Sequence, residues 1–377
     1  MIKKLKIAMF FSSDPASPGG VQEHAYHLAA ALKKIGHKVT VFVPNRRSIL
    51  LPYPNARTIG EFSEIPLPIG YDISYISKKE GENYAEMISG KKFDFIHIHD
   101  PFMPFLTYEL LNVLKLPIVT TYHATWETGS ALEAFRGFLP WLKDPLSKKV
   151  VGSIFVSRRT MECWREIFND KTEKSIIANG IDRSLFRKKA KTKKDRTEIL
   201  FLARLVPKKG LHLLLKSIKI LVARRKNIRL SVVGEGPDKQ RMIDYVRKNK
   251  LGQYVKFHGY VKKKDKPRYY QQADIFCAPY VNEGFGITLL EAMATGTPIV
   301  ALENNAFSEV LKTYPASELI VKEKNAVKMA DAIETLIDDE KLKQKIVKWE
   351  EREIKKYGWE KIAKETEKFY LKILGYS

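Results

Sequence analysis

Short apolar runs alternate with amphipathic helical patterns along the whole chain, and this alternation limits the possible folds more than any other feature. The runs Leu5–Phe11, Val39–Val43 and Phe95–Ile98 are apolar on both faces, as strands covered by helices on both sides must be. Between the first two runs lies a helical pattern, Val21–Ile35, with its apolar residues on one stripe. The repeated order of strand and helix predicts an α/β fold with parallel, doubly wound sheets.

The same alternation starts again after a basic segment of low hydrophobicity, Arg187–Glu198. A chain of 377 residues is long enough for two domains of ordinary size. We therefore predict two Rossmann-like domains, residues 1–180 and 181–354, that face each other across a cleft, followed by a C-terminal helix. The remaining strand-like runs lie at 117–121, 150–156, 199–203, 229–233, 255–258, 275–278 and 298–301, and further helical patterns lie at 211–225, from 287, and at 359–374.

The charge of the chain favours anionic partners. Lys and Arg number 66 against 43 Asp and Glu, a net charge of +23. Nucleic acid, phosphorylated small molecules and an anionic membrane surface all remain possible partners. The two cysteines, Cys163 and Cys277, form no paired motif and predict neither a disulfide framework nor a thiolate zinc site. We interpret Met1–Phe11 as a first strand and not as a signal peptide, and no run reaches the length of a membrane span.

Two loops follow strands and precede helices, where free backbone N–H groups and the helix dipole favour anions. The first, Ser12–Gly20, ends in Gly19 and Gly20, which allow a ligand to approach the backbone; a simple tight turn is the alternative. The second carries Arg204 and Lys209, a planar donor fork and a point charge that suit a pyrophosphate. Its alternative is a solvated basic loop.

A third segment contains two carboxylates eight positions apart. Glu283 lies in a glycine-rich turn, and Glu291 lies within the next helix among Leu289, Leu290, Ala292 and Met293. An unpaired charge in such apolar surroundings is costly, so Glu291 is expected to have a ligand or a cation as its partner. The alternative is that both acids are ordinary surface charges.

Taken together these segments resemble the retaining glycosyltransferases of family 4, which have the GT-B fold. Glu283 and Glu291 match the E-x7-E signature of the family. The resemblance extends over the whole chain and is closest to the phosphatidylinositol mannosyltransferases. Its motifs occur in the family's order as PGGVQEHAYHLAAALKKIGHKVTVFVP, FDFIHIHDP, PIVTTYHATW, IIANGID, ARLVPKKG, VVGEGP, HGYV, ADIFCAP and EAMATGTPIVA.

The resemblance implies transfer of a hexose, mannose or glucose, from a nucleotide diphosphate sugar with retention of configuration. It places the acceptor in the first domain, with the helix at about 355–377 packed back on it, and the donor in the second. The implied catalytic residues are His123, Arg204, Lys209 and Glu283. The implied donor-binding residues are Gly19, Gly20, Val261, Phe285, Gly286, Ile287, Thr288 and Glu291, and Gln22 lies on the acceptor side.

No cofactor or metal is expected. The chain contains no Asp-x-Asp motif, and the cations Arg204 and Lys209 are expected to replace a metal. His97 and His99 could suggest a metal cluster, but no thiolate or carboxylate completes a zinc spacing, so we interpret them as structural. Lys263 stands where the related mannosyltransferase carries an acid expected to read guanine, so both GDP- and UDP-linked donors stay open.

The acceptor is also open. It is expected to be a lipid or a small phosphorylated molecule, with a soluble glycoside as the alternative product. A nucleic-acid-binding protein is a distant alternative, because no recognisable motif accompanies the charge. The segment Gly129–Lys149 combines aromatic, aliphatic and basic side chains, as in a helix that lies on a bilayer. We therefore expect a cytoplasmic protein with peripheral attachment to the inner face of the membrane; packing of this segment inside the first domain is the alternative.

Overall fold

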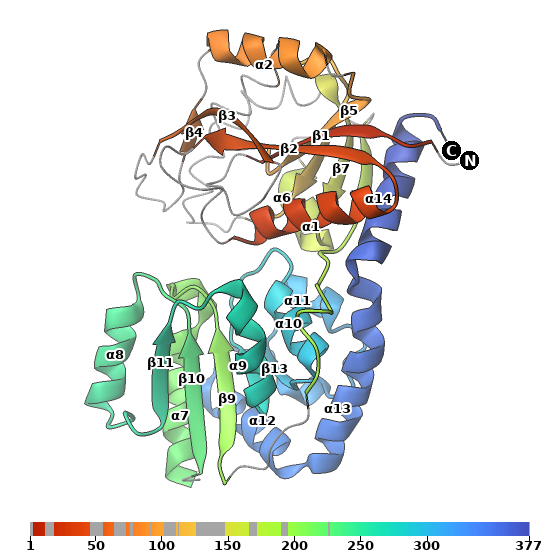
Figure 1. Cartoon of the computed structure of the whole chain (residues 1–377). Coiled ribbons are helices and arrows are strands. Elements are labelled where there is room, and N and C mark those ends of the chain that lie inside the picture. Colours follow the sequence, from red (N-terminus) through yellow and green to blue (C-terminus); the bar gives the residue numbers. More distant parts are fainter. Residues whose placement is uncertain are drawn as a thin grey trace. The chain divides into compact units, whose positions relative to one another are not determined.

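The computed structural model of the chain consists of two compact α/β units (Figure 1). One contains Met1–Gly180 together with Trp359–Ser377, and the other contains Ile181–Gly358. Each unit has a predominantly parallel sheet with helices against it, which confirms the predicted fold class. The described residues are 3–11, 19–45, 56–63, 73–75, 78–90, 92–101, 111, 113–125, 148–165, 172–189, 195–224 and 227–376.

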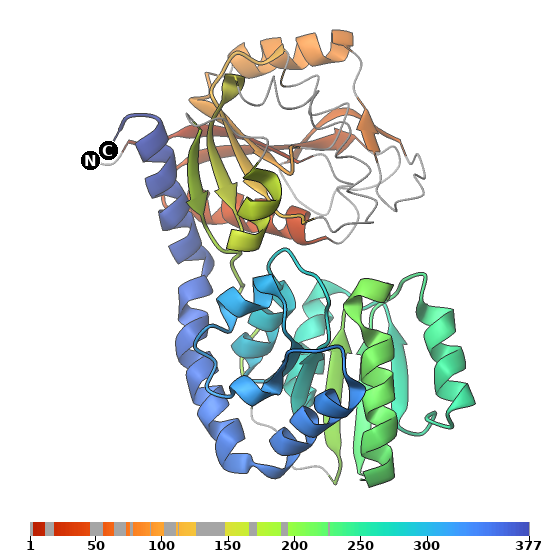
Figure 2. The same cartoon turned by 180° about the vertical axis from the view of Figure 1, so that it is seen from behind.

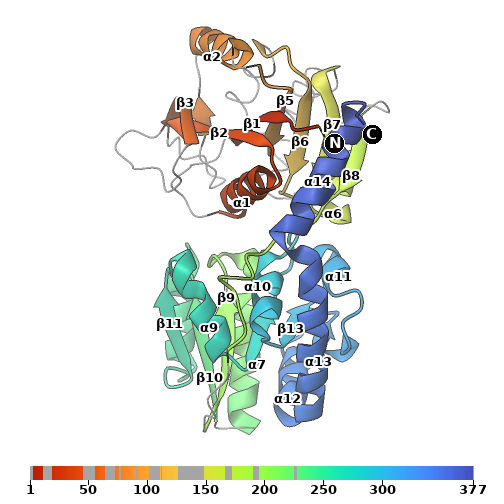
Figure 3. The same cartoon turned by 45° about the vertical axis from the view of Figure 1, so that its right-hand side comes forward.

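The first unit is built on a sheet with the strand order β4-β3-β2-β1-β5-β6-β7-β8 (Figure 3). Neighbouring strands are parallel except β3 and β4, which are antiparallel. The order reverses direction between β1 and β5, so the segments that follow these strands diverge at this point. The strands are β1 (Lys6–Phe11), β2 (Lys38–Asn45), β3 (Ala56–Ser63), β4 (Ile73–Tyr75), β5 (Phe95–His99), β6 (Ile118–Tyr122), β7 (Val150–Phe155) and β8 (Glu173–Ile176).

The sequence pattern found the central strands of this sheet and missed its edges. β8 reads EKSI, and its side chains alternate between half-buried and exposed. β3 reads ARTIGEFS and β4 has only three residues, ISY. β4 and β8 are the edge strands and β3 lies next to an edge, and strands in such positions are covered on fewer sides, so they need no continuous apolar run. The antiparallel pair β3–β4 also departs from the all-parallel sheet that the alternation predicts.

Helices α1 (Gly20–Lys34) and α14 (Trp359–Ile373) pack together in the first unit (Figures 1 and 2). Phe369 and Tyr370 of α14 lie in the same buried cluster as Leu28 and Leu32 of α1. The Tyr370 hydroxyl also lies 2.6 Å from Nδ1 of His97 on β5. Because of these contacts, the last helix of the chain belongs to the first unit. Among the described residues, this unit also contains α2 (Lys78–Gly90) and α6 (Arg158–Trp164).

A glycine on β7 provides the space for α14. A Cβ added to Gly152 would lie 2.9 Å from Cζ of Phe369 and 3.0 Å from Cδ1 of Ile373. We expect Gly152→Val to destabilise the chain by about 1–3 kcal/mol, because overpacking displaces well-packed neighbours. Urea unfolding followed by circular dichroism measures the change. Gly90→Ala is the control, since no described atom lies within 4 Å of its added Cβ; a loss as large as that of Gly152→Val would contradict the explanation.

The second unit has the strand order β11-β10-β9-β12-β13-β14, with the described strands all parallel. In order along the chain this is 3-2-1-4-5-6, the Rossmann arrangement, which binds ligands at the carboxyl ends of the strands where the order reverses. That switch point lies between β9 and β12. The strands are β9 (Thr197–Leu202), β10 (Ile228–Val233), β11 (Val255–Gly259), β12 (Ile275–Ala278), β13 (Ile299–Leu302) and β14 (Ile320–Val321).

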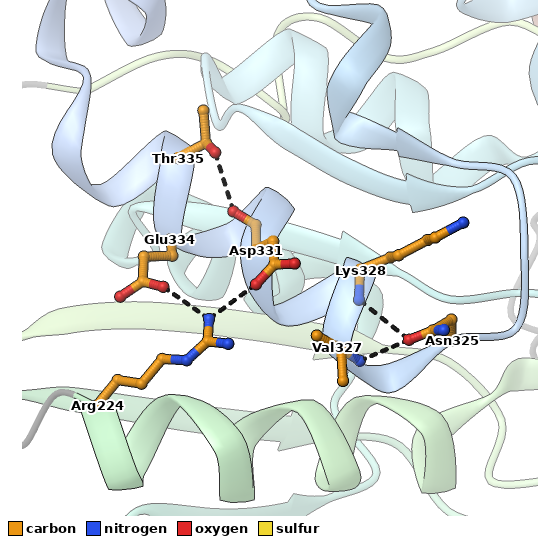
Figure 4. Close-up of polar contacts among 7 residues, drawn as sticks. All are labelled: Arg224, Asn325, Val327, Lys328, Asp331, Glu334 and Thr335. Atoms are coloured by element: carbon orange, nitrogen blue, oxygen red, sulfur yellow. Dashed lines mark hydrogen bonds and ion pairs between the residues drawn. The ribbon is translucent and has the colours of Figure 1, made fainter.

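Helices α7 (Leu211–Arg224) and α12 (Ala326–Asp338) pack side by side in this unit, and polar contacts fix their register (Figure 4). Arg224 donates to Asp331 at 2.7 Å and to Glu334 at 2.9 Å. Asn325 caps α12 by accepting from the backbone N–H groups of Val327 and Lys328. The other helices are α8 (Lys239–Lys248), α9 (Lys266–Gln272), α10 (Ile287–Thr295), α11 (Asn305–Val310) and α13 (Glu340–Glu353).

None of the helices in the described part of the chain combines the length and the apolar character that crossing a bilayer requires. The predicted interfacial segment, Gly129–Lys149, lies outside the described residues except for Lys148 and Lys149.

Candidate active site

The two segments on either side of the switch point in the second unit carry the predicted cations and the predicted carboxylate. Arg204 and Lys209 follow β9, and Glu283 follows β12. Arg204 is exposed, whereas the side chains of Lys209 and Glu283 are only 17% and 18% exposed. The structure therefore brings three of the four predicted catalytic residues to one edge of one sheet, where ligands of this fold bind.

Lys209 and Glu283 form an ion pair and share a hydrogen bond. The Lys209 ammonium also lies 4.5 Å from the centre of the Tyr280 ring, within the range of a cation–π contact. Burial lowers the pKa of Lys209 to about 7, and the charge of Lys208 acts in the same direction. Contact with the Glu283 carboxylate favours the protonated form. The pair is thus a partly buried cation and anion that an incoming ligand can separate.

Backbone contacts hold the two loops of this pair together. The N–H of Val281 donates to the carbonyl oxygen of Lys208 at 2.9 Å. Gly210 has a φ of +69°, and a Cβ added there would overlap the carbonyl oxygen of Pro279. The Tyr280 hydroxyl donates to the carbonyl oxygen of Leu202 at the end of β9, at 2.7 Å. Lys209 and Glu283 are therefore positioned by the fold and not by their own pairing alone.

The N-terminus of α10 lies directly after Glu283. Gly286 occupies the N-cap position with a φ of +97°, and a Cβ added there would lie 2.5 Å from Cε1 of Phe307. Phe285 is buried, and Ile287 and Thr288 are half-buried. The first N–H groups of a helix have no partner within the helix and carry partial positive charge. This end of α10 can therefore accept an anion or a hydroxyl at its backbone.

Glu291 is buried, and the fold itself supplies its partners. The Tyr270 hydroxyl donates to Glu291 Oε2 at 2.6 Å, and Lys266 Nζ lies 3.7 Å from Oε1. Both come from α9, which packs against α10. Glu291 thus has the partner that its apolar surroundings require, and no ligand is needed to supply it. Lys266 on α9 is the cation that faces this carboxylate.

Val261 and Lys263 follow β11, two strands away from β9 in the sheet. Both are half-buried, and Lys263 begins a short 3-10 turn, Lys263–Asp265. Gly259, the last residue of β11, has a φ of +70°, which turns the chain at this edge. The predicted base-contacting residue therefore lies at the carboxyl ends of the strands, as Arg204 and Glu283 do, but on a different strand.

The remaining predicted site residues belong to the first unit. Gly19 is the N-cap of α1 and Gly20 is its first residue. Gln22 is buried, with its side chain folded back beside Gly19, so that a Cβ on Gly19 would overlap the Gln22 carboxamide oxygen. His123 directly follows β6 and is half-buried. Gly19, Gly20 and His123 thus lie near the switch point of the first sheet, between β1 and β5.

His123 is one of four histidines that gather at this switch point. His97 and His99 come from β5, and His24 comes from α1. The Nδ1 atom of His99 lies 3.0 Å from Nε2 of His123, and the ring centres of His24 and His123 are 4.6 Å apart. His97 contacts Thr121 with one ring nitrogen and Tyr370 with the other, the structural role predicted from the sequence.

Burial keeps all four imidazoles neutral at pH 7. It lowers the pKa of His24 to about 4 and that of His97 to about 3, and it holds the pKa values of His99 and His123 well below the usual range. The neighbouring carboxyl, Asp100, is also buried, which raises its pKa to about 7, although it accepts a hydrogen bond from the His123 backbone N–H at 2.7 Å. Neutral imidazoles can accept hydrogen bonds or bind a cation.

The sequence pattern missed several residues that shape both sites. In the second unit these residues are Tyr280, whose ring contacts Lys209, and Tyr270, which donates to Glu291. In the first unit they are His24 and its hydrogen-bond partner Asn179. The position of Tyr280, two residues after a buried strand, is a signal that could have indicated it. No comparable signal existed for Asn179, because 155 positions separate it from His24.

Comparison with known proteins agrees with this geometry. Residues 18–185 match the family described as Glycosyltransferase Family 4, and residues 182–352 match the family Glycosyl transferases group 1. The phosphatidyl-myo-inositol mannosyltransferase of Mycolicibacterium smegmatis is 30% identical over 95% of this chain and 91% of that protein.

Solved structures show the same fold. The sucrose-phosphate synthase of Thermosynechococcus elongatus superposes with a TM-score of 0.78, 21% identity, and coverage of 99% of this chain and 100% of that one. HepE of Anabaena in complex with UDP-glucose gives a TM-score of 0.76 at 16% identity, covering 97% of this chain and 99% of that one. The family matches, the mannosyltransferase likeness and the two parallel-sheet units together show that the chain belongs to glycosyltransferase family 4, with the GT-B fold.

Proposed function

We propose that the protein is a retaining hexosyltransferase that moves mannose or glucose from a nucleotide diphosphate sugar to a lipid or phosphorylated acceptor. The observation that carries the proposal is the partly buried Lys209–Glu283 pair at the switch point of the second sheet, where Arg204 also follows β9. The likeness to phosphatidyl-myo-inositol mannosyltransferases over 95% of the chain supports a glycolipid product.

In the proposed reaction the bond between the anomeric carbon and the β-phosphate oxygen breaks, and the nucleotide diphosphate takes the electron pair. Arg204 and Lys209 stabilise this growing negative charge, which is the kind of electrostatic work that lowers a barrier most. When the pyrophosphate takes Lys209, Glu283 is released to accept hydrogen bonds from the sugar hydroxyls. The oxygen of an acceptor hydroxyl bonds to the anomeric carbon from the face that the nucleotide leaves, and its proton passes to the departing phosphate oxygen, so the configuration is retained.

The other site residues are assigned to the two substrates. Phe285, Gly286, Ile287 and Thr288 offer backbone groups at the start of α10 to the donor, and Val261 offers its backbone to the base. Glu291 binds the ribose through the carboxylate that Tyr270 and Lys266 orient. In the first unit, Gly19 and Gly20 face the donor phosphate and reacting sugar, His123 contacts the sugar near its anomeric carbon, and Gln22 lies on the acceptor side.

The chain's own cations take the place that a metal ion holds in other sugar transferases, so we propose transfer without a metal or other cofactor. The protein is proposed to act in the cytoplasm, attached peripherally to the inner face of the membrane through the segment 129–149. The net charge of +23 supports attraction to an anionic surface and to anionic substrates, while the site residues give no reason to expect nucleic acid as a partner.

A donor screen tests the proposal. Release of nucleotide diphosphate is measured for GDP-mannose, GDP-glucose, UDP-glucose and UDP-N-acetylglucosamine, each with vesicles that contain phosphatidylinositol and with soluble sugar phosphates. We expect one hexose donor to be turned over in the presence of the lipid acceptor. Turnover with soluble acceptors alone would replace the lipid by a soluble product, and no release with any donor would contradict the transferase assignment.

The same vesicles test the attachment. Co-sedimentation is compared between anionic vesicles and neutral phosphatidylcholine vesicles, because each basic residue near an anionic surface contributes roughly 1 kcal/mol. We expect binding to anionic vesicles that weakens with added salt. Equal and negligible binding to both kinds of vesicle would contradict peripheral attachment and favour the soluble acceptor.

A further inference from the structure

Three histidines at the switch point of the first sheet each bring one ring nitrogen close to the other two. His24, His99 and His123 each offer one nitrogen atom, and these atoms all lie within 4.8 Å of one another. The three residues come from α1, from the end of β5 and from the segment after β6, so tertiary folding alone brings them together. We propose that this three-histidine cluster binds a divalent transition-metal ion of the zinc class.

The first supporting contact orients His24. Its Nδ1 atom lies 2.6 Å from the side-chain oxygen of Asn179. A carboxamide oxygen can only accept, so Nδ1 of His24 carries the proton and Nε2 carries the lone pair. Histidines that bind metals almost always donate their second ring nitrogen to an oxygen in this way, which fixes the ring and its tautomer. Asn179 thus holds His24 in the state that a metal ligand requires.

The second supporting observation concerns His99. Its side chain is 0% exposed, and its Nε2 atom has no hydrogen-bond partner among the described residues. Its Nδ1 atom lies 3.0 Å from Nε2 of His123, so one of these two neutral rings donates its proton to the lone pair of the other. An ion that displaces this hydrogen bond binds the lone pairs of His99 Nδ1 and His123 Nε2. Each ring then carries its single proton on its other nitrogen, which for His99 is the Nε2 atom.

The dimensions of the cluster suit a tetrahedral ion after small side-chain movements. With zinc–nitrogen bonds of about 2.0–2.1 Å, ligand nitrogens of a tetrahedral site lie about 3.3 Å apart. His99 Nδ1 and His123 Nε2 are already 3.0 Å apart, and the 4.8 Å limit leaves His24 within reach by rotation of its ring. Three histidines leave the fourth position of such a site open to water or another ligand.

This proposal does not depend on the proposed function. An ion at this cluster occupies His123, the residue assigned above to the donor sugar, so it competes with that contact and does not take part in transfer. Binding of the ion is therefore measured without any substrate, and its outcome leaves the transferase assignment to its own test.

The experiment uses the full chain without a polyhistidine tag, first stripped of metals with a chelator. Zn²⁺ is titrated by calorimetry, and Co²⁺ is used as a spectroscopic probe because four-coordinate cobalt absorbs visible light strongly. We expect one ion per chain and intense cobalt bands. His24→Ala, His99→Ala and His123→Ala should each abolish the bands, whereas Asn179→Ala, which keeps all three ligands, should weaken zinc binding by about 10–100-fold.

His212→Ala is the matched control, since this histidine lies on α7 in the second unit. It should leave both zinc affinity and the cobalt bands unchanged. Far-UV circular dichroism checks that each variant is folded, and His123→Ala, which removes a half-buried side chain, is the variant expected to tolerate the change best. The proposal is overturned if the wild-type chain shows no zinc binding, or if folded His123→Ala or Asn179→Ala binds zinc as tightly as the wild type.

Discussion

Replacing Lys209 with alanine is expected to lower kcat on the order of 10²-fold or more, the effect of losing one preorganised charge-stabilising group. Arg204→Ala should have a loss of the same order. The chemical step should suffer more than donor binding, because the negative charge on the leaving nucleotide is largest in the transition state. Steady-state kinetics with the donor found in the screen measure the change. Near-normal turnover by both variants would show that these cations do not hold the pyrophosphate.

Two further variants separate charge from general effects on stability. Lys216→Ala removes an exposed lysine of α7 and should leave kcat unchanged. Lys209→Arg keeps a positive charge at every pH of interest, since arginine is not deprotonated in proteins. Because burial lowers the pKa of Lys209 to about 7, its charge is lost as the pH rises through that value, and binding of nucleotide diphosphate to the wild type should weaken. The same weakening in Lys209→Arg would assign it to another group.

Gly210→Ala is expected to destabilise the second unit by about 2–5 kcal/mol. A left-handed backbone costs a residue with a side chain about 1–2 kcal/mol, and forced overlap in a packed region adds about 1–3 kcal/mol. Both apply here, because Gly210 has a φ of +69° and an added Cβ meets the carbonyl oxygen of Pro279. At 2–4 °C for each kcal/mol in a domain of this size, the melting temperature should fall by at least about 4 °C.

The substitution should also separate the loops that carry Lys209 and Glu283, so donor binding should fall together with stability. Gly252→Ala is the control, since no described atom lies within 4 Å of its added Cβ and its φ is not in the left-handed range. Scanning calorimetry of the two variants and the wild type makes the comparison. A melting temperature of Gly210→Ala equal to that of Gly252→Ala would show that the contact with Pro279 is not tight.

The sequence pattern predicted the central strands well because burial on both faces leaves a continuous apolar run. Phe276 and Cys277 on β12 and Ile7 and Met9 on β1 are all fully buried. The predicted bounds of β12 match the observed ones, and those of β1 differ by one residue. Edge strands such as β8 carry no such run, and their pairing depends on neighbours that are distant along the chain.

Some residues of the candidate site could also be predicted from the sequence, and others could not. Residues that follow a strand and precede a helix, such as Arg204, Lys209 and Glu283, could be placed from local order alone, because the carboxyl ends of parallel strands share one edge. The residues that contact them could not be predicted from local order. Tyr270 reaches Glu291 across 21 positions, and Asn179 reaches His24 across 155. No spacing rule relates such positions.

The sequence by itself thus determined the α/β class, the two repeats of strand and helix, the family, and the loops that follow the strands at each switch point. All of these depend on local periodicity and on motifs that are contiguous along the chain. Only the tertiary structure decided which groups share a site. It paired Lys209 with Glu283, gave Glu291 partners from α9, and joined His24 to His99 and His123. The reason is physical: burial and the packing of distant elements set the distance between polar atoms, and those distances determine charge, tautomer and ligand binding.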